Sequence, residues 1–132
     1  MKPISASITK TLNQNTTCTC ADNSGAKEVY IITVFGHHTR YRQKPAAGIA
    51  DMVNIVVSKG KPEIRKKIER AIVVRVKKEY KRPDGTRIKF DDNAVVLVDE
   101  KGLPKASEVK GVVAKEVGER YPKIAGLATS VI

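Results

Sequence analysis

The stretch RAIVVRVKKEYKRPDGTRIKF, residues 70–90, predicts a β-hairpin. Two runs with alternating side chains flank Pro83-Asp84-Gly85, and this tripeptide supplies the backbone dihedral angles that a tight turn needs. Within each run, apolar side chains share one face and charged side chains share the other, following the two-residue period of a strand. We therefore expect one face of the hairpin to be core and the other to be strongly basic.

Other apolar runs flank the hairpin on both sides. They are rich in β-branched residues, and residues typical of turns close each of them. We expect strands at residues 16–21, 28–35, 52–58 and 94–98. Short strands with irregular connections favour a closed β-barrel rather than an open sheet.

Helical patterns are confined to two places. Pro62 is suited to the first turn of a helix, so one or two helical turns at most are expected near it. From about residue 112, apolar residues recur at helical spacing, and Pro122 is expected to end this short helix. Residues 123–132 form an apolar tail that could pack on the sheet.

These elements predict a mainly β fold: a small five-stranded closed β-barrel with a basic β-hairpin and a short C-terminal helical extension. A chain of 132 residues is long enough for a single domain with one modest core. Residues 1–15 are interpreted as a loose N-terminal arm, because a short polar stretch ends them. Residues 16–132 form the barrel domain, with its C-terminal helix from about residue 112.

The chain is strongly basic. It has 25 Lys and Arg against 14 Asp and Glu, a formal net charge of +11 and a pI near 9.8. Such a charge predicts a polyanionic partner, either nucleic acid or an anionic membrane. The N-terminus lacks the apolar segment of a secretory signal, and no run approaches the roughly 18 apolar residues of a membrane-spanning helix. We expect a soluble cytosolic protein.

Basic residues gather in four clusters with few compensating acids, which favours a wide phosphate-binding surface over a merely solvated one. Aromatic residues make up only 5% of the chain, and no glycine–aromatic RNA-binding motif occurs. Recognition of folded RNA by shape and backbone is therefore favoured over stacking on unpaired bases. The predicted RNA-binding residues are Arg40, Arg42, Lys44, Lys59, Lys61, Arg65, Lys66, Lys67, Arg75, Lys77, Lys78, Lys81, Arg82, Arg87 and Lys89.

The cysteines and histidines do not have the spacing of a metal site. Zinc ligands typically come with about two to four residues between cysteines and about three to five between histidines. Cys18 and Cys20 are instead separated by one residue, and His37 and His38 are adjacent. On a strand the two cysteines share a face, where free cysteine packs as a small hydrophobe. We predict two reduced, packed thiols, no metal and no cofactor.

No arrangement of residues predicts catalysis. The adjacent acidic pairs Asp91-Asp92 and Asp99-Glu100 are explained as turn residues at strand ends, and no nucleophile with a histidine accompanies them. The two common glycine-rich phosphate loops are missing from the sequence. We predict no catalytic residues and no enzymatic activity. A small-barrel factor that binds single-stranded nucleic acid stays open as the alternative; it would need exposed aromatic residues on one sheet face.

Three stretches resemble one known family: ADNSGAKEV at residues 21–29, RPDGTRIKFDDNAVVLVD at residues 82–99 and GVVAKEV at residues 111–117. Together with KGKPEIRKK before the hairpin and ERYPKIAGLA near the end, they are similar to the fourteenth universal protein of the large ribosomal subunit, in its archaeal and eukaryotic branch. The similarity runs in one register from about residue 16 to the C-terminus.

The resemblance implies a structural constituent of the large subunit in the cytoplasmic ribosome, acting in translation and not at a membrane. It implies binding to large-subunit ribosomal RNA at the subunit interface, and an intersubunit bridge to small-subunit ribosomal RNA. Neighbouring ribosomal proteins, including the third large-subunit protein, and an anti-association initiation factor are the implied protein partners. By position, the loop at residues 36–44 and the hairpin should touch RNA. The implied protein-contact residues are Val113, Lys115, Glu116, Arg120 and Tyr121.

Three residues depart from the family pattern. Val112 stands where proline is usual, Ala106 where glycine is common, and Tyr121 where this branch often has tryptophan. Proline at a helix start fixes φ, so Val112 bears on how the helix begins. Ala106 raises the question of whether its turn needs a positive φ. Tyr121 keeps an aromatic ring, so we expect its protein contact to be retained.

Overall fold

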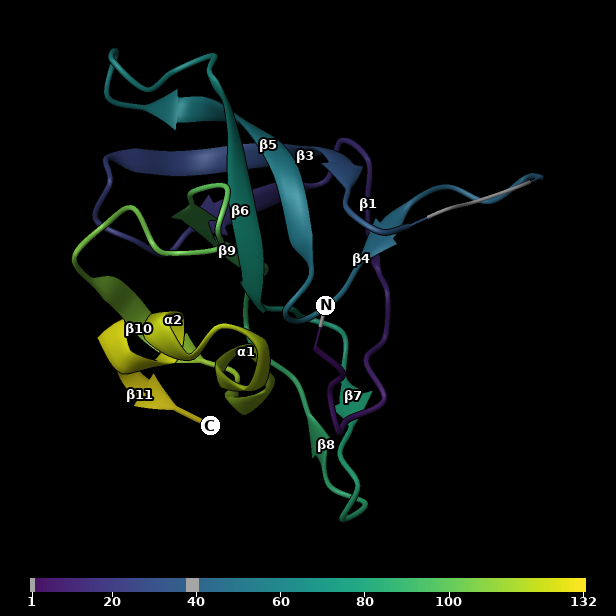
Figure 1. Cartoon of the computed structure of the whole chain (residues 1–132). Coiled ribbons are helices and arrows are strands. Elements are labelled where there is room, and N and C mark those ends of the chain that lie inside the picture. The colour runs from purple at the N-terminus through teal and green to yellow at the C-terminus, as the bar shows by residue number, and fades with distance from the viewer. Residues whose placement is uncertain (1, 38–40) are drawn as a thin grey trace.

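The computed structural model describes residues 2–37 and 41–132. Five strands close into a barrel in the order β2-β3-β5-β6-β9 (Figure 1). Strand β2 pairs in parallel with β9, and the other neighbours are antiparallel. The mainly β fold and the closed five-stranded barrel are thus confirmed. The barrel strands are β2 (Thr17–Cys20), β3 (Ala26–Val34), β5 (Met52–Gly60), β6 (Ile68–Arg75) and β9 (Ala94–Val98).

The barrel interior is filled with aliphatic, mostly β-branched side chains. Ile31, Ile55 and Ile72 are fully buried, and each such side chain stabilises the fold by about 2 kcal/mol relative to an exposed one. All five residues of β9 and four consecutive residues of β6 are also buried. The C-terminal segment packs outside β6, where the Ala114 amide donates to the Val74 carbonyl at 3.3 Å. Burial on both faces explains why these runs are continuously apolar.

The β-hairpin is shorter than its sequence pattern indicates. It consists of β7 (Tyr80–Lys81) and β8 (Arg87–Ile88), which pair in antiparallel register. The predicted turn is present, because Gly85 has φ +90° and its amide donates to the Arg82 carbonyl. The first predicted arm is mostly β6, which pairs with β5 and β9. The prediction of one continuous arm was therefore wrong, since alternation does not identify a strand's neighbour.

No regular helix forms near Pro62, where one or two helical turns at most were expected. A single turn is present, in which the Arg65 amide donates to the Lys61 carbonyl at 3.2 Å, and the Lys66 amide then donates back to the Val57 carbonyl of β5 at 2.9 Å. Lys66 has φ +61°, a conformation that a right-handed helix excludes. This segment is a projecting turn between β5 and β6.

The C-terminal unit contains β10 (Val109–Val113), α1 (Lys115–Arg120), α2 (Pro122–Leu127) and β11 (Ala128–Val131). Residues 112 and 113, expected in the helix, belong instead to β10, which pairs in parallel with β11. The helix therefore begins at Lys115, about three residues later than expected, and the predicted apolar tail forms most of α2 and all of β11. Pro122 ends α1, as predicted, and is also the first residue of α2. Neither of these helices, the only ones in the described residues, is long and apolar enough to cross a membrane.

Two of the departures from the family pattern have structural answers. Val112 lies in β10, where its partner in β11 is Ser130, and therefore not at a helix start. The residue before α1 is Ala114, which gives α1 no side-chain cap. Ala106 does not adopt a positive φ, so its turn does not require glycine.

The N-terminal arm is tied to the barrel, in contrast to the loose arm expected. Strand β1 (Leu12–Asn13) pairs with β4 (Ala46–Ala47), and Leu12 is buried. Nearer the N-terminus, the Ser7 amide donates to the Lys81 carbonyl at 2.9 Å. The arm runs past β7 in Figure 1, so it joins the hairpin to the barrel. Polar composition did not indicate these contacts, because their partners, Ala46–Ala47 and Lys81, lie far away in the sequence.

Candidate nucleic-acid interface

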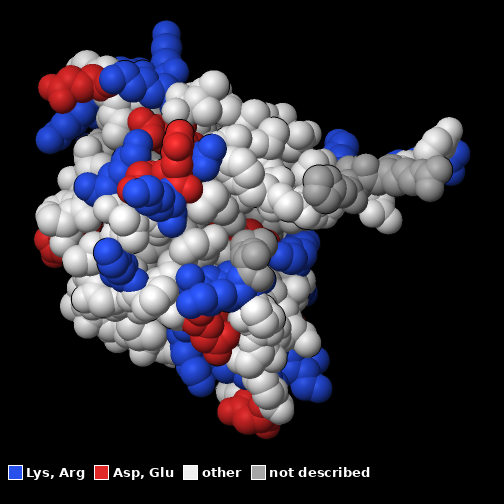
Figure 2. Space-filling model, in the orientation of Figure 1, with Lys and Arg blue, Asp and Glu red and all other residues white. Residues whose placement is uncertain are grey.

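Three basic segments project from the barrel: the described residues 41–45 before β4, the turn between β5 and β6, and the β7–β8 hairpin (Figure 1). Figure 2 shows Lys and Arg side chains on each of them, with acidic side chains also present on the projections and on the face between them. Most predicted RNA-binding residues are exposed on these segments or on the residues that adjoin them: Arg42, Lys44, Lys59, Lys61, Arg65, Lys66, Lys67, Lys77, Lys78, Lys81, Arg87 and Lys89. Arg40 lies outside the described residues.

Ion pairs compensate few of these exposed cations. Lys59 lies 3.1 Å from Glu28 and Arg87 lies 3.8 Å from Glu79, and all four side chains are well exposed. Surface pairs of this kind contribute at most about 1 kcal/mol, so they compete weakly with a phosphate group. The projecting segments are therefore free to meet an anionic partner.

Arg75 has an internal role. Its Nε donates to Asp92 Oδ1 at 2.8 Å, and its Nη2 donates to the other carboxylate oxygen at 3.2 Å. Its Nη1 donates to the carbonyls of Lys110 and Val112. The side chain is only 12% exposed. Arg75 thus connects β6 to β10, and Asp92, interpreted above as a turn residue, is its ionic partner.

Arg82 is likewise used inside the chain. Its Nε donates to Glu116 Oε1 at 2.8 Å, and its Nη2 donates to the Ile132 carbonyl at 2.6 Å. Burial opposes the charge of Arg82, but hydrogen bonds to Glu116 and Tyr80 raise its pKa above the usual value. This arginine connects the hairpin to the C-terminal unit instead of presenting its donors to solvent.

One exposed aromatic residue stands on the segment between β3 and β4. Tyr41 is 82% exposed, and the Arg42 guanidinium lies 5.9 Å from the centre of its ring. The other exposed aromatic side chain in the described chain, Phe35, lies under Arg70 at 5.0 Å. Two exposed rings, one of them covered by Arg70, do not make the row of aromatic side chains that a single-strand-binding barrel would use for stacking.

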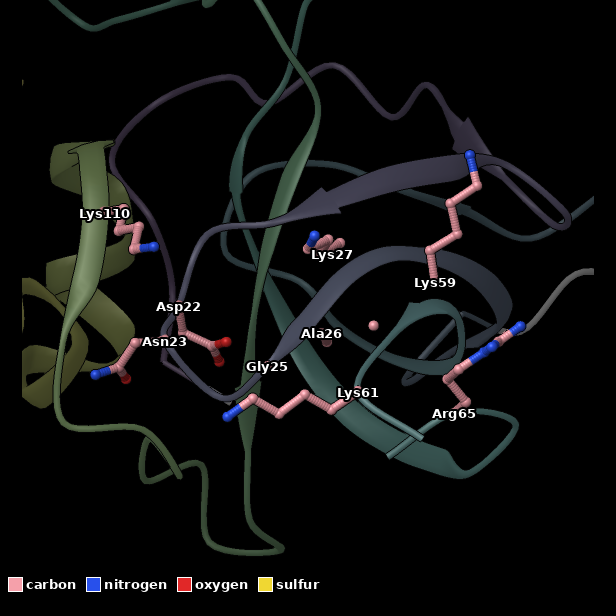
Figure 3. A pocket seen from close by; sticks show the side chains of 10 residues that line it. Asp22, Asn23, Gly25, Ala26, Lys27, Lys59, Lys61, Arg65 and Lys110 are labelled. Atoms are coloured by element: carbon pink, nitrogen blue, oxygen red, sulfur yellow. The ribbon is translucent and has the colours of Figure 1, made fainter. Parts of the chain in front are cut away.

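A basic hollow of about 670 Å³ lies beside the turn that follows β2 (Figure 3). Its wall includes Lys27 and Lys110, which the sequence patterns did not single out. Neither belongs to a run of basic residues, but Lys27 lies within the family motif ADNSGAKEV and Lys110 directly precedes GVVAKEV. The residues that line the hollow are Asp22, Asn23, Gly25, Ala26, Lys27, Lys59, Gly60, Lys61, Arg65 and Lys110.

Both cysteines are free and buried, as predicted. Burial raises the pKa of Cys18 to about 11, and burial together with the nearby Asp22 carboxylate raises the pKa of Cys20 to about 12. The thiols are therefore protonated at neutral pH and are poor metal ligands. In residues 2–37 and 41–132, no group of three or more His, Cys, Asp or Glu could hold a metal ion. His38 lies outside these residues.

The predicted protein-contact residues do not share one surface. Val113 in β10 and Glu116 in α1 are buried within the chain, so the expectation that they touch a partner directly needs correction. Arg120 is 14% exposed, and its Nη1 lies 3.3 Å from Asp51 Oδ1. Lys115 is exposed. Tyr121 is partly exposed and packs over Gly102, where a Cβ would come within 2.9 Å of its ring.

The barrel and its basic projections define a class of protein: a small basic β-barrel suited to a polyanionic partner. Comparison with known proteins is more specific. The family model described as Ribosomal protein L14p/L23e matches residues 11–132. The chain therefore belongs to this family, and its relatives make it a protein of archaeal type, which confirms the resemblance found in the sequence. It is a structural protein of the large subunit of the cytoplasmic ribosome.

Several relatives are similar over the whole chain. The Large ribosomal subunit protein uL14 of Methanoregula boonei is 50% identical over 132 residues, all of both chains. The protein of the same name from Halobacterium salinarum is 46% identical over the same span. That of Sulfurisphaera tokodaii is 50% identical over 125 residues, which cover 95% of this chain and 91% of the relative.

Proposed function

We propose that the chain binds large-subunit ribosomal RNA at the subunit interface through the projecting basic segments. The observation that carries this proposal is the set of exposed, mostly uncompensated cations on three segments of one rigid barrel. Each phosphate that such a cation neutralises releases a counterion, which favours association at low salt. Lysines and arginines without an aromatic platform suit the backbone of folded RNA.

The outermost parts of the interface are the loop after β3 and the hairpin. Arg42, Arg87 and Lys89 are exposed there and form the core of the proposed contact. Arg75 and Arg82, both in the initial set, act instead by fixing β6 and the hairpin against the C-terminal unit. The hairpin projects from the barrel in Figure 1, and it is the segment we assign to the intersubunit bridge with small-subunit ribosomal RNA.

The C-terminal unit is the proposed protein-facing side. Lys115 and the partly exposed ring of Tyr121 lie on it, while Val113 and Glu116 hold it in place from within. The partners proposed for this side are the third large-subunit protein and an anti-association initiation factor. Loss of factor binding in the variant K115E/Y121A, with RNA binding unchanged, would support this assignment; loss of both would contradict it.

Binding of the full chain to large-subunit ribosomal RNA from Methanoregula boonei tests the RNA proposal. The logarithm of the affinity should fall linearly with the logarithm of the salt concentration, with a slope of several units. The variant R42E/R87E/K89E should lose most of this binding, whereas K2E/K101E/K123E, which changes the charge equally on other surfaces, should lose much less. An affinity independent of salt, or equal effects of the two variants, would refute the proposed interface. Stronger binding to single-stranded polyuridine would favour the alternative factor.

A further inference from the structure

The basic hollow lies apart from the hairpin, between the turn at Asp22–Gly25, the end of β5 and β10 (Figure 3). Resting on the RNA-binding function proposed above, we propose that this hollow extends the interface with a further site for backbone phosphate groups of folded RNA, held mainly by Lys27, Lys61 and Lys110.

Asp22, the acidic residue of the lining, does not neutralise these cations through an ion pair. It is 4% exposed. Its Oδ1 accepts hydrogen bonds from the Ser24 amide at 3.2 Å and from the Cys20 thiol at 3.0 Å. Its Oδ2 accepts one from the Leu97 amide at 3.0 Å. The carboxylate is therefore committed to holding the turn, and the hollow keeps a net positive charge.

The cations that line the hollow come from three segments far apart in the sequence. Among them only Lys59 has an acidic partner, Glu28, within the part of the chain that the structure describes. Unpaired cations that share one hollow repel one another, so an anion that enters it relieves this repulsion as well as gaining attraction. The five cations are Lys27 from β3, Lys59 from β5, Lys61 and Arg65 from the following turn, and Lys110 from β10.

Two glycines allow the walls of the hollow to meet. A Cβ at Gly60 would lie 2.7 Å from the Gly25 carbonyl oxygen, and one at Gly25 would lie 2.8 Å from Cδ of Lys61. The Lys61 amide donates to the Gly25 carbonyl at 3.2 Å. The aliphatic part of Lys61 therefore crosses directly over Gly25, and Figure 3 shows this side chain extended along the turn.

The opposite wall is fixed by backbone hydrogen bonds. The Lys110 amide donates to the Ala21 carbonyl at 2.6 Å, and the Asn23 amide donates to the Glu108 carbonyl at 3.3 Å. In Figure 3 Lys110 approaches the Asp22–Gly25 turn from β10. Since the backbone on both sides is already ordered, an incoming anion restricts only the lysine side chains, which lowers the entropic cost of binding.

The lining suits a phosphate backbone better than an acidic peptide. Protein interfaces are usually anchored by large apolar or aromatic side chains in pockets. The apolar side chain in this lining is Ala26, which offers no such anchor. Lys61 and Arg65 also belong to the basic turn between β5 and β6, and Lys59 lies at the end of β5 that leads into it, so the hollow continues a basic track along which successive phosphates can lie.

The variant K27Q/K61Q/K110Q tests this site through the salt dependence of binding to the Methanoregula boonei large-subunit RNA. If each lysine neutralises one phosphate, the log–log slope should fall by about three, since each contact contributes roughly 0.9. The matched control K2Q/K101Q/K123Q removes the same charge elsewhere and should leave the slope within about one unit. Equal slopes for the two variants would refute the hollow, whereas a wild-type protein without salt-dependent binding would refute the proposed function itself.

Lysine acetylation of the wild-type protein, read by mass spectrometry, gives a second measurement that needs no substitution. RNA should protect Lys27, Lys61 and Lys110 at least about threefold more than Lys123, as expected when bound phosphates cover the amines. Equal protection by inorganic phosphate alone at the same phosphate concentration would overturn the assignment to RNA. Protection by polyglutamate but not by RNA would show a peptide site and would also overturn it.

Discussion

The Tyr80 hydroxyl donates a hydrogen bond of 2.6 Å to Oε2 of Glu116, and this bond joins the hairpin to helix α1. Both residues are 2% exposed. Because Arg82 also binds Glu116, two residues of the hairpin share one buried carboxylate. The hairpin proposed to touch RNA and the helix proposed to face proteins are thus held as one unit.

Replacing Glu116 with glutamine should lower the free energy of unfolding by about 3 kcal/mol, because it leaves the largely buried guanidinium of Arg82 without its counter-charge. Urea denaturation followed by circular dichroism measures this change. The control E119Q alters an exposed contact with Ser5 and should cost less than about 0.5 kcal/mol. A loss for E116Q as small as that of the control would show that the cluster does not stabilise the fold.

Replacing Tyr80, Arg82 and Glu116 together should lower the free energy of unfolding by less than the sum of the three single replacements. The variant Y80F/R82M/E116L leaves no buried charge or hydroxyl without a partner, and apolar replacements of a buried ion pair are often neutral. We expect its loss of unfolding free energy to be smaller than the sum of the losses for Y80F, R82M and E116L. A strictly additive result would contradict the coupling inferred from these contacts.

Substituting Gly111 with alanine should loosen the C-terminal unit. Gly111 has φ +78°, and a Cβ there would lie 2.7 Å from Nη1 of Arg75. The control is G85A, at φ +90° with open space around it, which adds backbone strain without a clash. We expect G111A to lower the free energy of unfolding by about 2 kcal/mol, more than G85A does, and to speed proteolysis within residues 115–132. Equal losses of unfolding free energy in G111A and G85A would show that the contact of Arg75 with β10 does not stabilise the C-terminal unit.

The barrel could be predicted from sequence because its signals are local. Turn residues at Pro83-Asp84-Gly85 and apolar runs such as residues 94–98 report their own conformation. These local signals do not show which strand each strand pairs with in the sheet. Strand β6 pairs with β5 and β9, and nothing in its alternation distinguishes that arrangement from a hairpin with the residues after Gly85.

The candidate site was predictable only in part, for the same reason. Clusters such as residues 59–67 are visible as runs of basic residues. Arg75 and Arg82 lie in similar runs, but their acidic partners are 17 and 34 residues away in the sequence. Conversely, Lys27 and Lys110 join a basic hollow only because the fold brings β3 and β10 together.

Asp51 should control how firmly the N-terminal arm is held. This buried carboxylate binds the Lys10 ammonium group and accepts hydrogen bonds from the Gly48 amide at 2.8 Å and from Arg120 at 3.3 Å. We expect D51N to increase amide hydrogen exchange in residues 2–12 and to lower the free energy of unfolding by about 2–3 kcal/mol. The variant S5A removes an exposed contact of the same arm and should change exchange only near its own position. Unchanged exchange in D51N would contradict this role.

Cys18 and Cys20 should make the protein sensitive to alkaline pH. Their pKa values are about 11 and 12 in the folded protein, against 9.0 for an ordinary thiol. Above pH 9 the unfolded chain therefore loses thiol protons that the folded chain keeps, and stability falls as pH rises toward 12. Replacing both with alanine creates cavities at every pH but removes this titration. Between pH 8 and pH 11 the unfolding free energy of the wild type should fall more steeply than that of C18A/C20A, as measured by urea denaturation; parallel curves would show that the thiols ionise equally in both states.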